Sequence, residues 1–307
     1  MIEAVGLTKT YGDTVAVDGL SFSVPPGRVT GFLGPNGAGK STTMRMILGL
    51  DNPTAGHALI AGRRYRDLRR PLRTVGALLD AAWVHPNRSA RTHLRWLARS
   101  NGIPAGRAEE VLEAVGLAPA ADRLAGGFSL GMAQRLGIAG ALLGDPEVLL
   151  FDEPVNGLDP EGVRWIRGLM HRLADEGRTV LVSSHLLSEM ALTAQDLIVI
   201  GRGRLIAQCG VEEFVARATE SSVRVRTPDA ARLRALLEGE GAAVHDEDGA
   251  LIVTGAESSF IGEMCAANGV VLHELSLLRG SLEEAFMRLT GDALDYQAVQ
   301  EQEGAGR

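Results

Sequence analysis

The sequence predicts an α/β fold with a mostly parallel central sheet, followed by a small α+β domain. Three short, almost wholly apolar segments at 29–33, 148–151 and 180–184 have the composition of strands that are covered on both faces. A helical segment opens at Lys40, directly after the first strand and a glycine-rich loop, which is how a βαβ unit begins. A shift in composition near residue 218 separates this part from the second domain.

The same patterns predict the domain organisation. We expect a first domain at 1–217, with an all-helical insertion at about 87–144 that is rich in Arg, Ala and Leu. A hairpin is expected where 196–200 and 204–208 flank Gly201-Arg202-Gly203. In the second domain, 218–290, the expected strands are 222–226 and 251–254, and the expected helices are 230–238 and 281–289. The polar tail at 291–307 is expected to be flexible.

Composition narrows the possible classes of protein. The chain has 307 residues, 45% hydrophobic and 22% charged, with no apolar run long enough to span a bilayer and a polar N-terminus unlike a secretory signal. We therefore expect a cytoplasmic protein whose two cysteines, Cys209 and Cys265, are reduced. The net charge of −7 argues against a nucleic-acid partner.

A phosphate-binding loop lies between the first strand and its helix. The run fits GxxxxGK[ST] and consists of Gly34, Pro35, Asn36, Gly37, Ala38, Gly39, Lys40 and Ser41, followed by Thr42. Glycines let backbone amides approach phosphate oxygens, and the helix N-terminus adds positive charge. Lys40 is one of two lysines in a chain that otherwise uses arginine, which indicates a need for a compact charge there. We predict that Lys40 binds the β- and γ-phosphates of ATP and that Ser41 binds Mg²⁺.

Two acids complete this predicted site at the end of the 148–151 strand. Ligands bind at the carboxyl edge of open α/β sheets. Asp152 has the oxygen atoms that Mg²⁺ prefers, and Glu153 is placed to polarise a water molecule for attack on the γ-phosphate. Without the phosphate loop upstream, Asp152 and Glu153 would indicate only a strand that ends in a solvated acidic turn.

A third motif narrows the choice among families that share the phosphate loop. It is the segment Phe128-Ser129-Leu130-Gly131-Met132-Ala133-Gln134-Arg135. It resembles the signature motif of ABC ATPases, usually LSGGQ, with Leu130 in place of the first glycine and Met132 in place of the glutamine. Ser129 also has the residue type of a helix N-cap, so an ordinary capped helix is the alternative. The order of the three motifs favours the ABC family, whose P-loop, RecA-like domain carries a helical subdomain.

The resemblance implies roles for further residues. Tyr11 matches the aromatic residue that stacks on adenine, although a surface or core tyrosine is the alternative. Gly157-Leu158-Asp159-Pro160 resembles the D-loop, and His185 resembles the switch histidine that contacts the γ-phosphate. In this family two copies close head-to-tail on two ATP molecules, so Ser129 and Gly131 would face the nucleotide of the other copy.

The sequences of these motifs are similar to those of ABC-2-type drug-resistance exporters. This resemblance implies a homodimer of ATP-hydrolysing subunits, peripheral on the inner face of the membrane. The pair would power export of an unknown substrate, such as a drug, an antibiotic or a lipid, through a separately encoded permease. The alternatives are a soluble ABC protein acting on DNA or ribosomes and an importer ATPase with a regulatory C-terminal domain. The chain has one cassette, a short insertion and no basic tract of the kind expected for the first alternative.

Asp80 departs from the family pattern. Alignment through Gly76 and Pro86 places it where the family has a glutamine that touches Mg²⁺ and links the core to the helical subdomain. Asp80 also has a carboxyl oxygen, but its side chain is one methylene shorter and charged. We expect it to ligate Mg²⁺ in the closed dimer, with a solvated loop acid as the alternative.

Overall fold

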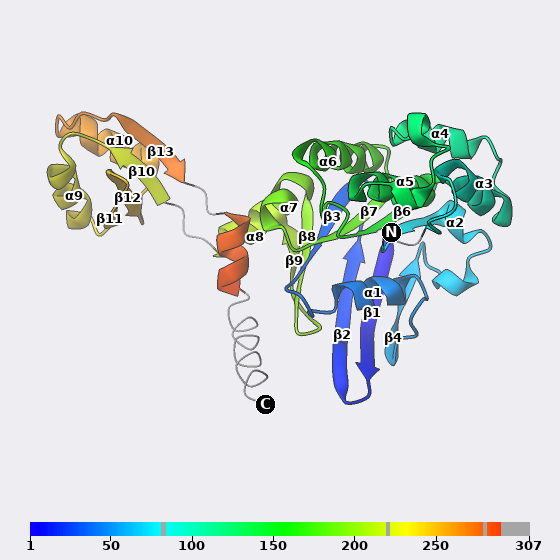
Figure 1. Cartoon of the computed structure of the whole chain (residues 1–307). Coiled ribbons are helices and arrows are strands. Elements are labelled where there is room, and N and C mark those ends of the chain that lie inside the picture. The colour runs from blue at the N-terminus through cyan, green and yellow to red at the C-terminus, as the bar shows by residue number, and fades with distance from the viewer. Residues whose placement is uncertain (81–83, 219–221, 279–280, 290–307) are drawn as a thin grey trace, which may run out of the picture. The chain divides into compact units, whose positions relative to one another are not determined.

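The computed structural model describes residues 1–80, 84–218, 222–278 and 281–289. It divides into two compact units, Met1–Gly210 and a second one that begins at Val211 (Figure 1). The sequence analysis placed this boundary after residue 217, so helix α8 (Val211–Ala218) groups with the second unit instead. The predicted flexible tail at 291–307 lies outside the described residues.

A six-stranded sheet forms the centre of the first unit. Its strands in spatial order are β5 (Val75–Leu78), β6 (Val148–Asp152), β7 (Thr179–Ser184), β3 (Arg28–Leu33), β8 (Asp196–Gly201) and β9 (Arg204–Gly210). The first five are parallel, and β9 pairs antiparallel with β8 in the predicted hairpin. The three apolar strands predicted from the sequence are therefore confirmed, with ends that differ by one residue.

A second, antiparallel sheet covers one face of the central sheet, and the sequence analysis did not predict it. Its strands in spatial order are β2 (Thr14–Val24), β1 (Ile2–Tyr11) and β4 (Ala55–Ile60). Helix α1 (Lys40–Ile47) contacts all three of these strands and also β6. The rings of Phe22 on β2 and Phe32 on β3 lie 5.6 Å apart between centroids, so the two sheets share one apolar core.

Helices α6 (Pro160–Asp175) and α7 (Leu187–Thr193) cover the opposite face (Figure 1). Side chains that alternate along β3 pack against neighbours on both faces of the sheet. Phe32 belongs to the core shared with α1, whereas a Cβ on Gly31 would lie 2.6 Å from the sulfur of Met190 on α7. Coverage on both faces explains why the central strands are apolar almost throughout.

Between β5 and β6 the chain forms the predicted helical insertion. Its helices are α3 (Ala90–Ser100), α4 (Arg107–Ala114) and α5 (Leu130–Leu142), with 3₁₀ turns η3 (Ala118–Ala120) and η4 (Ala125–Gly127). Apart from an isolated bridge between Ser89 and Leu124, residues 87–144 contain no β structure. In the described ranges, the helices are too short or too polar to traverse a lipid bilayer.

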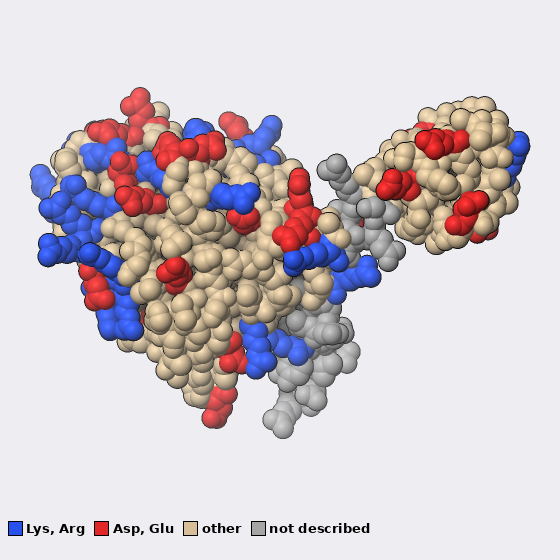
Figure 2. Space-filling view, turned by 180° about the vertical axis from the view of Figure 1, so that it is seen from behind, with Lys and Arg blue, Asp and Glu red and all other residues tan. Residues whose placement is uncertain are grey.

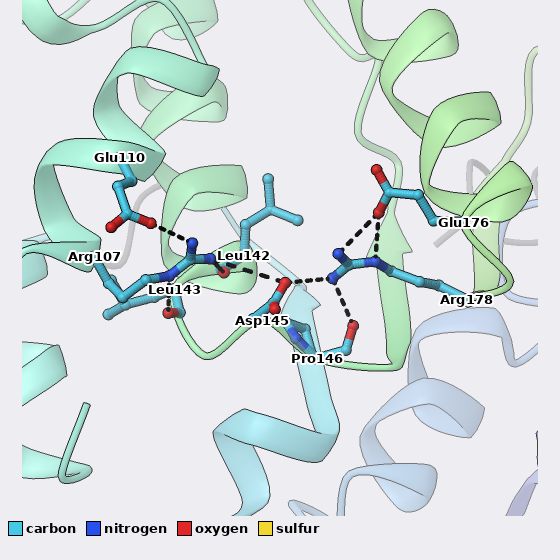
Figure 3. Close-up of polar contacts among 8 residues, drawn as sticks. All are labelled: Arg107, Glu110, Leu142, Leu143, Asp145, Pro146, Glu176 and Arg178. Carbon is cyan, nitrogen blue, oxygen red and sulfur yellow. Dashed lines mark hydrogen bonds and ion pairs between the residues drawn. The ribbon is translucent and has the colours of Figure 1, made fainter. Parts of the chain in front are cut away.

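A small polar network joins the insertion to the central sheet at the connection from α5 to β6 (Figure 3). The Asp145 carboxylate lies 2.9 Å from the Arg178 guanidinium and 3.9 Å from that of Arg107 on α4. Arg178 also donates to the carbonyl of Pro146 at 3.0 Å, and Arg107 donates to two carbonyls at the end of α5. The network ties the end of α5 both to α4 and to the residue that precedes β7.

The second unit contains a four-stranded antiparallel sheet with two helices. The chain order is β10 (Ser222–Arg226), α9 (Ala230–Gly239), β11 (Ala243–Glu247), β12 (Ala250–Thr254), α10 (Ser258–Ala267) and β13 (Glu274–Leu278), and residues 282–289 are helical. The spatial strand order β11-β12-β10-β13 gives the ferredoxin-like arrangement. The core includes Val223, Leu233 and Ile261, from β10, α9 and α10. The predicted α+β class is confirmed.

Candidate nucleotide site

The phosphate loop, the two acids and His185 lie at the carboxyl edge of the central sheet. Strands β3, β6 and β7 are parallel neighbours whose ends are in register, with Leu33 opposite Ser184 and Asp152 opposite Ser183. The phosphate loop, Glu153 and His185 follow these three strand ends directly. The topology therefore brings together segments that are more than a hundred residues apart in the chain.

The phosphate loop is seated closely against its neighbours. Gly39 has φ of 100°, and a Cβ on it would lie 2.6 Å from the carbonyl oxygen of Ala16. A Cβ on Gly34 would lie equally close to the carbonyl oxygen of Ile200, at the end of β8. Side chains at these two positions would force the backbone of the loop away from the sheet, so glycine is required there.

The β8–β9 hairpin also supports this loop. This contact was not predicted from the sequence. The amide of Gly203 donates to the carbonyl of Ala38 at 3.1 Å, and the amide of Asp18 donates to the carbonyl of Gly203 at 2.9 Å. The glycine turn at 201–203 had signalled a hairpin, but nothing in the local sequence indicated its partner.

Lys40 begins α1 and is 7% exposed. Its ammonium donates to the carbonyls of Gly34 at 2.6 Å and Pro35 at 3.3 Å, and lies 4.0 Å from the Glu153 carboxylate. Burial lowers the pKa of Lys40, while the carboxylates of Glu153 and Asp152 oppose that effect. A buried cation held by carbonyl groups and one distant carboxylate is suited to receive a stronger anion such as a phosphate.

The hydroxyls after Lys40 differ in exposure. Ser41 is exposed and Thr42 is half-buried, whereas Thr43 is buried and donates to the carbonyl of Gly39 at 2.8 Å. Thr43 thus stabilises the start of α1, and Ser41 is accessible to a ligand.

The two acids at the end of β6, Asp152 and Glu153, are held in place by Ser183 of β7. The Ser183 hydroxyl donates to the Asp152 carboxylate and accepts a hydrogen bond from the amide of Glu153 at 3.0 Å. Glu153 has φ of 49°, an uncommon backbone conformation for a residue with a side chain. Strain of this kind persists where surrounding contacts fix it. Ser183 was not among the predicted site residues, although it lies only two residues before His185.

His185 contacts the proposed catalytic acid directly. Its Nδ1 lies 2.8 Å from Oε2 of Glu153. The structure thus brings Lys40, Glu153 and His185 into one cluster, and oxygen ligands suited to Mg²⁺ lie beside it on Asp152 and Ser41.

Tyr11 is 49% exposed at the end of β1, as a residue that binds a ligand with its ring would be. Its hydroxyl donates to the Asp51 carboxylate at 3.2 Å, and Arg45 of α1 donates to the same oxygen at 2.8 Å. The Lys9 ammonium lies 4.8 Å from the Tyr11 ring centroid and donates to the carbonyl of Asn52. The sequence analysis did not identify Asp51 or Arg45, because no motif marks them.

Ser129 caps the N-terminus of α5 by accepting a hydrogen bond from the amide of Met132 at 3.3 Å. Leu130 is 54% exposed, yet a Cβ on Gly157 would lie 2.1 Å from one of its methyl groups. A Cβ on Gly131 would lie 3.3 Å from Leu158. The start of α5 therefore packs on residues 157–158 of the same chain.

Asp80 is exposed two residues after β5 ends. It lines an apolar groove of about 240 Å³. Leu72 and Leu97 contribute to the walls, which come from the sheet and from the helical insertion. Asp80 therefore lies at the junction of the nucleotide edge and the insertion.

Comparisons with known proteins agree with this geometry. A family model described as ABC transporter matches residues 17–156, and one described as a domain of unknown function matches residues 221–283. The chain is 37% identical over 300 residues to the bacitracin transport ATP-binding protein of Bacillus licheniformis, covering 95% of this chain and 97% of that protein. It is 35% identical to the daunorubicin/doxorubicin resistance ATP-binding protein of Streptomyces peucetius, with 98% and 95% covered.

Among solved structures, a dimeric ATP-binding cassette in a post-hydrolysis state bound to ADP and Pi has a TM-score of 0.63 and 26% identity. The match covers 68% of this chain and 98% of the cassette in that structure. The fold, the order of the motifs and these relatives agree, and the chain belongs to the ABC transporter family of ATP-binding transport ATPases.

Proposed function

We propose that this chain hydrolyses ATP to power export of an antibiotic-like compound through a separately encoded ABC-2-type permease. The observation that carries the proposal is the cluster of Lys40, Glu153 and His185 at the sheet edge, in a chain that resembles exporter subunits along nearly its whole length. Relatives named for bacitracin transport and for daunorubicin/doxorubicin resistance support the class of substrate. The chain would work at the inner face of the cell membrane.

In this proposal each side chain has one role. The loop amides from Gly34 to Thr42 and the Lys40 ammonium bind the phosphates of ATP. Mg²⁺, held by Ser41 and Asp152, would neutralise phosphate charge when bound. Glu153 orients the attacking water molecule, and His185 responds to the γ-phosphate. Positioning and charge stabilisation provide most of the catalysis in this class of reaction.

A homodimer completes the site. Ser129 and Gly131 of one copy would close on the nucleotide bound to the other copy, with the α5 N-terminus facing its phosphates. The dimeric post-hydrolysis cassette among the similar structures supports this arrangement. Since each copy carries its own Glu153 and Ser129, both sites of the pair would be competent.

A helix of the permease would dock in the apolar groove beside Asp80. Leu72, Leu97 and Leu136 line this groove, which therefore suits the apolar face of a partner helix. Its walls come from both the sheet and the insertion, so closure on ATP would change its shape. This is the route by which hydrolysis would move the permease.

The test is export in cells that carry the chain together with the membrane protein encoded beside it. We expect lower accumulation of a peptide antibiotic or an anthracycline, and no such effect with Glu153→Gln. Equal accumulation with the wild-type chain and with this variant, across a panel of both compound types, would contradict export. Loss of ATP hydrolysis measured on the same samples separates failure of the enzyme from a wrong substrate.

A further inference from the structure

The connection between β4 and β5 is basic, and the expectation that the chain has no basic tract overlooked it. Residues 61–74, here called the arginine segment, include the 3₁₀ turn η1 (Tyr65–Asp67) and helix α2 (Pro71–Thr74). The segment holds a single acid, Asp67, in a chain whose net charge is −7. Its exposed basic residues are Arg63, Arg64, Arg66, Arg69, Arg70 and Arg73.

Apolar residues in the segment fix its orientation. Tyr65 and Leu68 are partly buried against the core of the first unit, and Leu72 lines the apolar groove beside Asp80. Because these residues face inward, the arginines between them face solvent. Figure 2 shows Lys and Arg side chains gathered at the edge of the first unit where Figure 1 places β4, α2 and α3.

Four of these arginines differ from the exposed arginines that form ion pairs elsewhere in the chain. Arg63, Arg64, Arg69 and Arg70 form no ion pair with any residue that the structure describes. Several exposed arginines elsewhere have carboxylate partners, as Arg28 has with Asp196, Arg204 with Asp18, and Arg217 with Glu213. The residues that the structure describes therefore leave most of the positive charge of the segment without a carboxylate partner.

We propose that the arginine segment binds the anionic phospholipid headgroups of the membrane directly, in addition to any contact with the permease. The inference rests on the proposed function, since a permease helix docked in the groove would bring the adjoining segment to the bilayer surface. The arginines lie along an exposed connection, and a broad surface with many anions can engage all six of them together. An acidic segment of the permease is the competing partner.

The number of charges is sufficient for such binding. Clusters of four to eight basic residues are typical of sites for anionic lipids. Each basic residue near such a surface strengthens binding by roughly fivefold, so removing three should weaken it by about a hundredfold. The attraction extends over a Debye length of about 10 Å at 0.1 M salt, so it should be sensitive to salt.

The experiment is co-sedimentation of the full-length chain with vesicles of phosphatidylcholine alone or with 30% phosphatidylglycerol. We expect binding to the anionic vesicles, which is lost in 0.5 M salt and weakened about a hundredfold in Arg64→Gln/Arg69→Gln/Arg70→Gln. The matched control is Arg28→Gln/Arg204→Gln/Arg217→Gln, which removes the same charge at paired arginines and should bind like the wild type.

Equal weakening in the two triple variants would overturn the proposal, because net charge rather than the segment would then control binding. Equal sedimentation with both kinds of vesicle would also overturn it. If the wild type ignores anionic vesicles but the segment variant loses its permease, the partner is an acidic protein segment and not lipid. ATP binding by each variant shows whether the variant is folded and has an intact nucleotide site. Loss of lipid binding can therefore be distinguished from failure of the proposed function.

Discussion

His185 and Glu153 contact each other through a 2.8 Å approach of Nδ1 to Oε2, and the other carboxylate oxygen of Glu153 lies 4.0 Å from the Lys40 ammonium. In the described chain, the carboxylate proposed to orient water thus lies between a histidine and the lysine proposed to bind phosphate. A γ-phosphate bound by Lys40 would compete for that ammonium and release one oxygen of Glu153. ATP binding and activation of the acid would then be linked by the same lysine.

Glu153→Gln should reduce ATP turnover by 10² to 10⁴-fold while preserving ATP binding, because an amide cannot accept the proton of the attacking water. The variant should accumulate as an ATP-bound dimer, which size-exclusion chromatography with ATP and Mg²⁺ would detect. Turnover at the wild-type rate would remove Glu153 from its proposed role. His185→Ala is the comparison variant. It keeps the Glu153 carboxylate and should slow turnover less than Glu153→Gln does.

Lys40→Met should weaken ATP binding by roughly a hundredfold, equivalent to about 3 kcal/mol, because the charged hydrogen bonds to phosphate disappear. The nucleotide-free variant should remain folded, since burial already disfavours the charged form of this lysine. Isothermal titration with ATP and thermal unfolding without nucleotide provide the two measurements. Unchanged affinity would refute the assignment of the phosphate loop.

Asp51→Asn should raise the KM for ATP by several-fold with little change in kcat, because the carboxylate fixes the Tyr11 hydroxyl proposed to orient the adenine-stacking ring. Hydrogen bonding to Arg45 lowers the pKa of Asp51, so the carboxylate is ionised at neutral pH. Binding of tripolyphosphate, which lacks a base, should be unaffected. Asp13→Asn, at an exposed acid nearby, should resemble the wild type; an equal effect there would argue against Asp51.

Asp80→Ala should lower turnover and weaken its dependence on Mg²⁺, with little effect on ATP binding. Asp80→Gln should retain much of the activity, since it restores the residue that the family uses. Steady-state hydrolysis across a magnesium titration measures both. If the alanine variant keeps the wild-type rate and metal requirement, Asp80 is a solvated loop acid.

His93 on α3 should make the stability of the first unit depend on pH. Burial, followed by the charge of Arg88, lowers the pKa of His93 from its ordinary value of 6.5. The unfolded chain then binds the proton more tightly, so this contribution to stability is complete above pH 6.5 and is lost as the pH falls through the lowered value. Urea unfolding, followed by tryptophan fluorescence at pH 7.5 and 5.5, should show a lower midpoint in acid.

His93→Leu should reduce that difference between the two pH values, and His245→Gln, at an exposed histidine of the second unit, should leave it unchanged. The sequence from Val211 onward contains no tryptophan, so the signal does not report unfolding of the second unit. A midpoint difference that survives His93→Leu would assign the pH dependence to other groups.

Apolar runs and local motifs were enough to predict the central strands, the α1 start and the cluster around Lys40. These features depend on neighbouring residues, as in the glycine loop before Lys40 or the two acids at the end of β6. The antiparallel β1–β2–β4 sheet was missed, because its irregular pairing interrupts the alternation of side chains. Contacts such as Gly203 with Ala38 and Tyr11 with Asp51 depend on tertiary packing across long stretches of chain, which one sequence does not reveal.

Leu130, where the family has a glycine, fills the space that a side chain on Gly157 would need. The start of α5 and the turn before α6 are therefore in close contact within one subunit, so a shift of one would displace the other. In the proposed head-to-tail pair, the first of these segments faces the neighbour's nucleotide while the second lies along the subunit boundary. A hydrocarbon contact would then relay the state of one ATP to the surface around the other, giving the two sites of the pair a cooperative cycle.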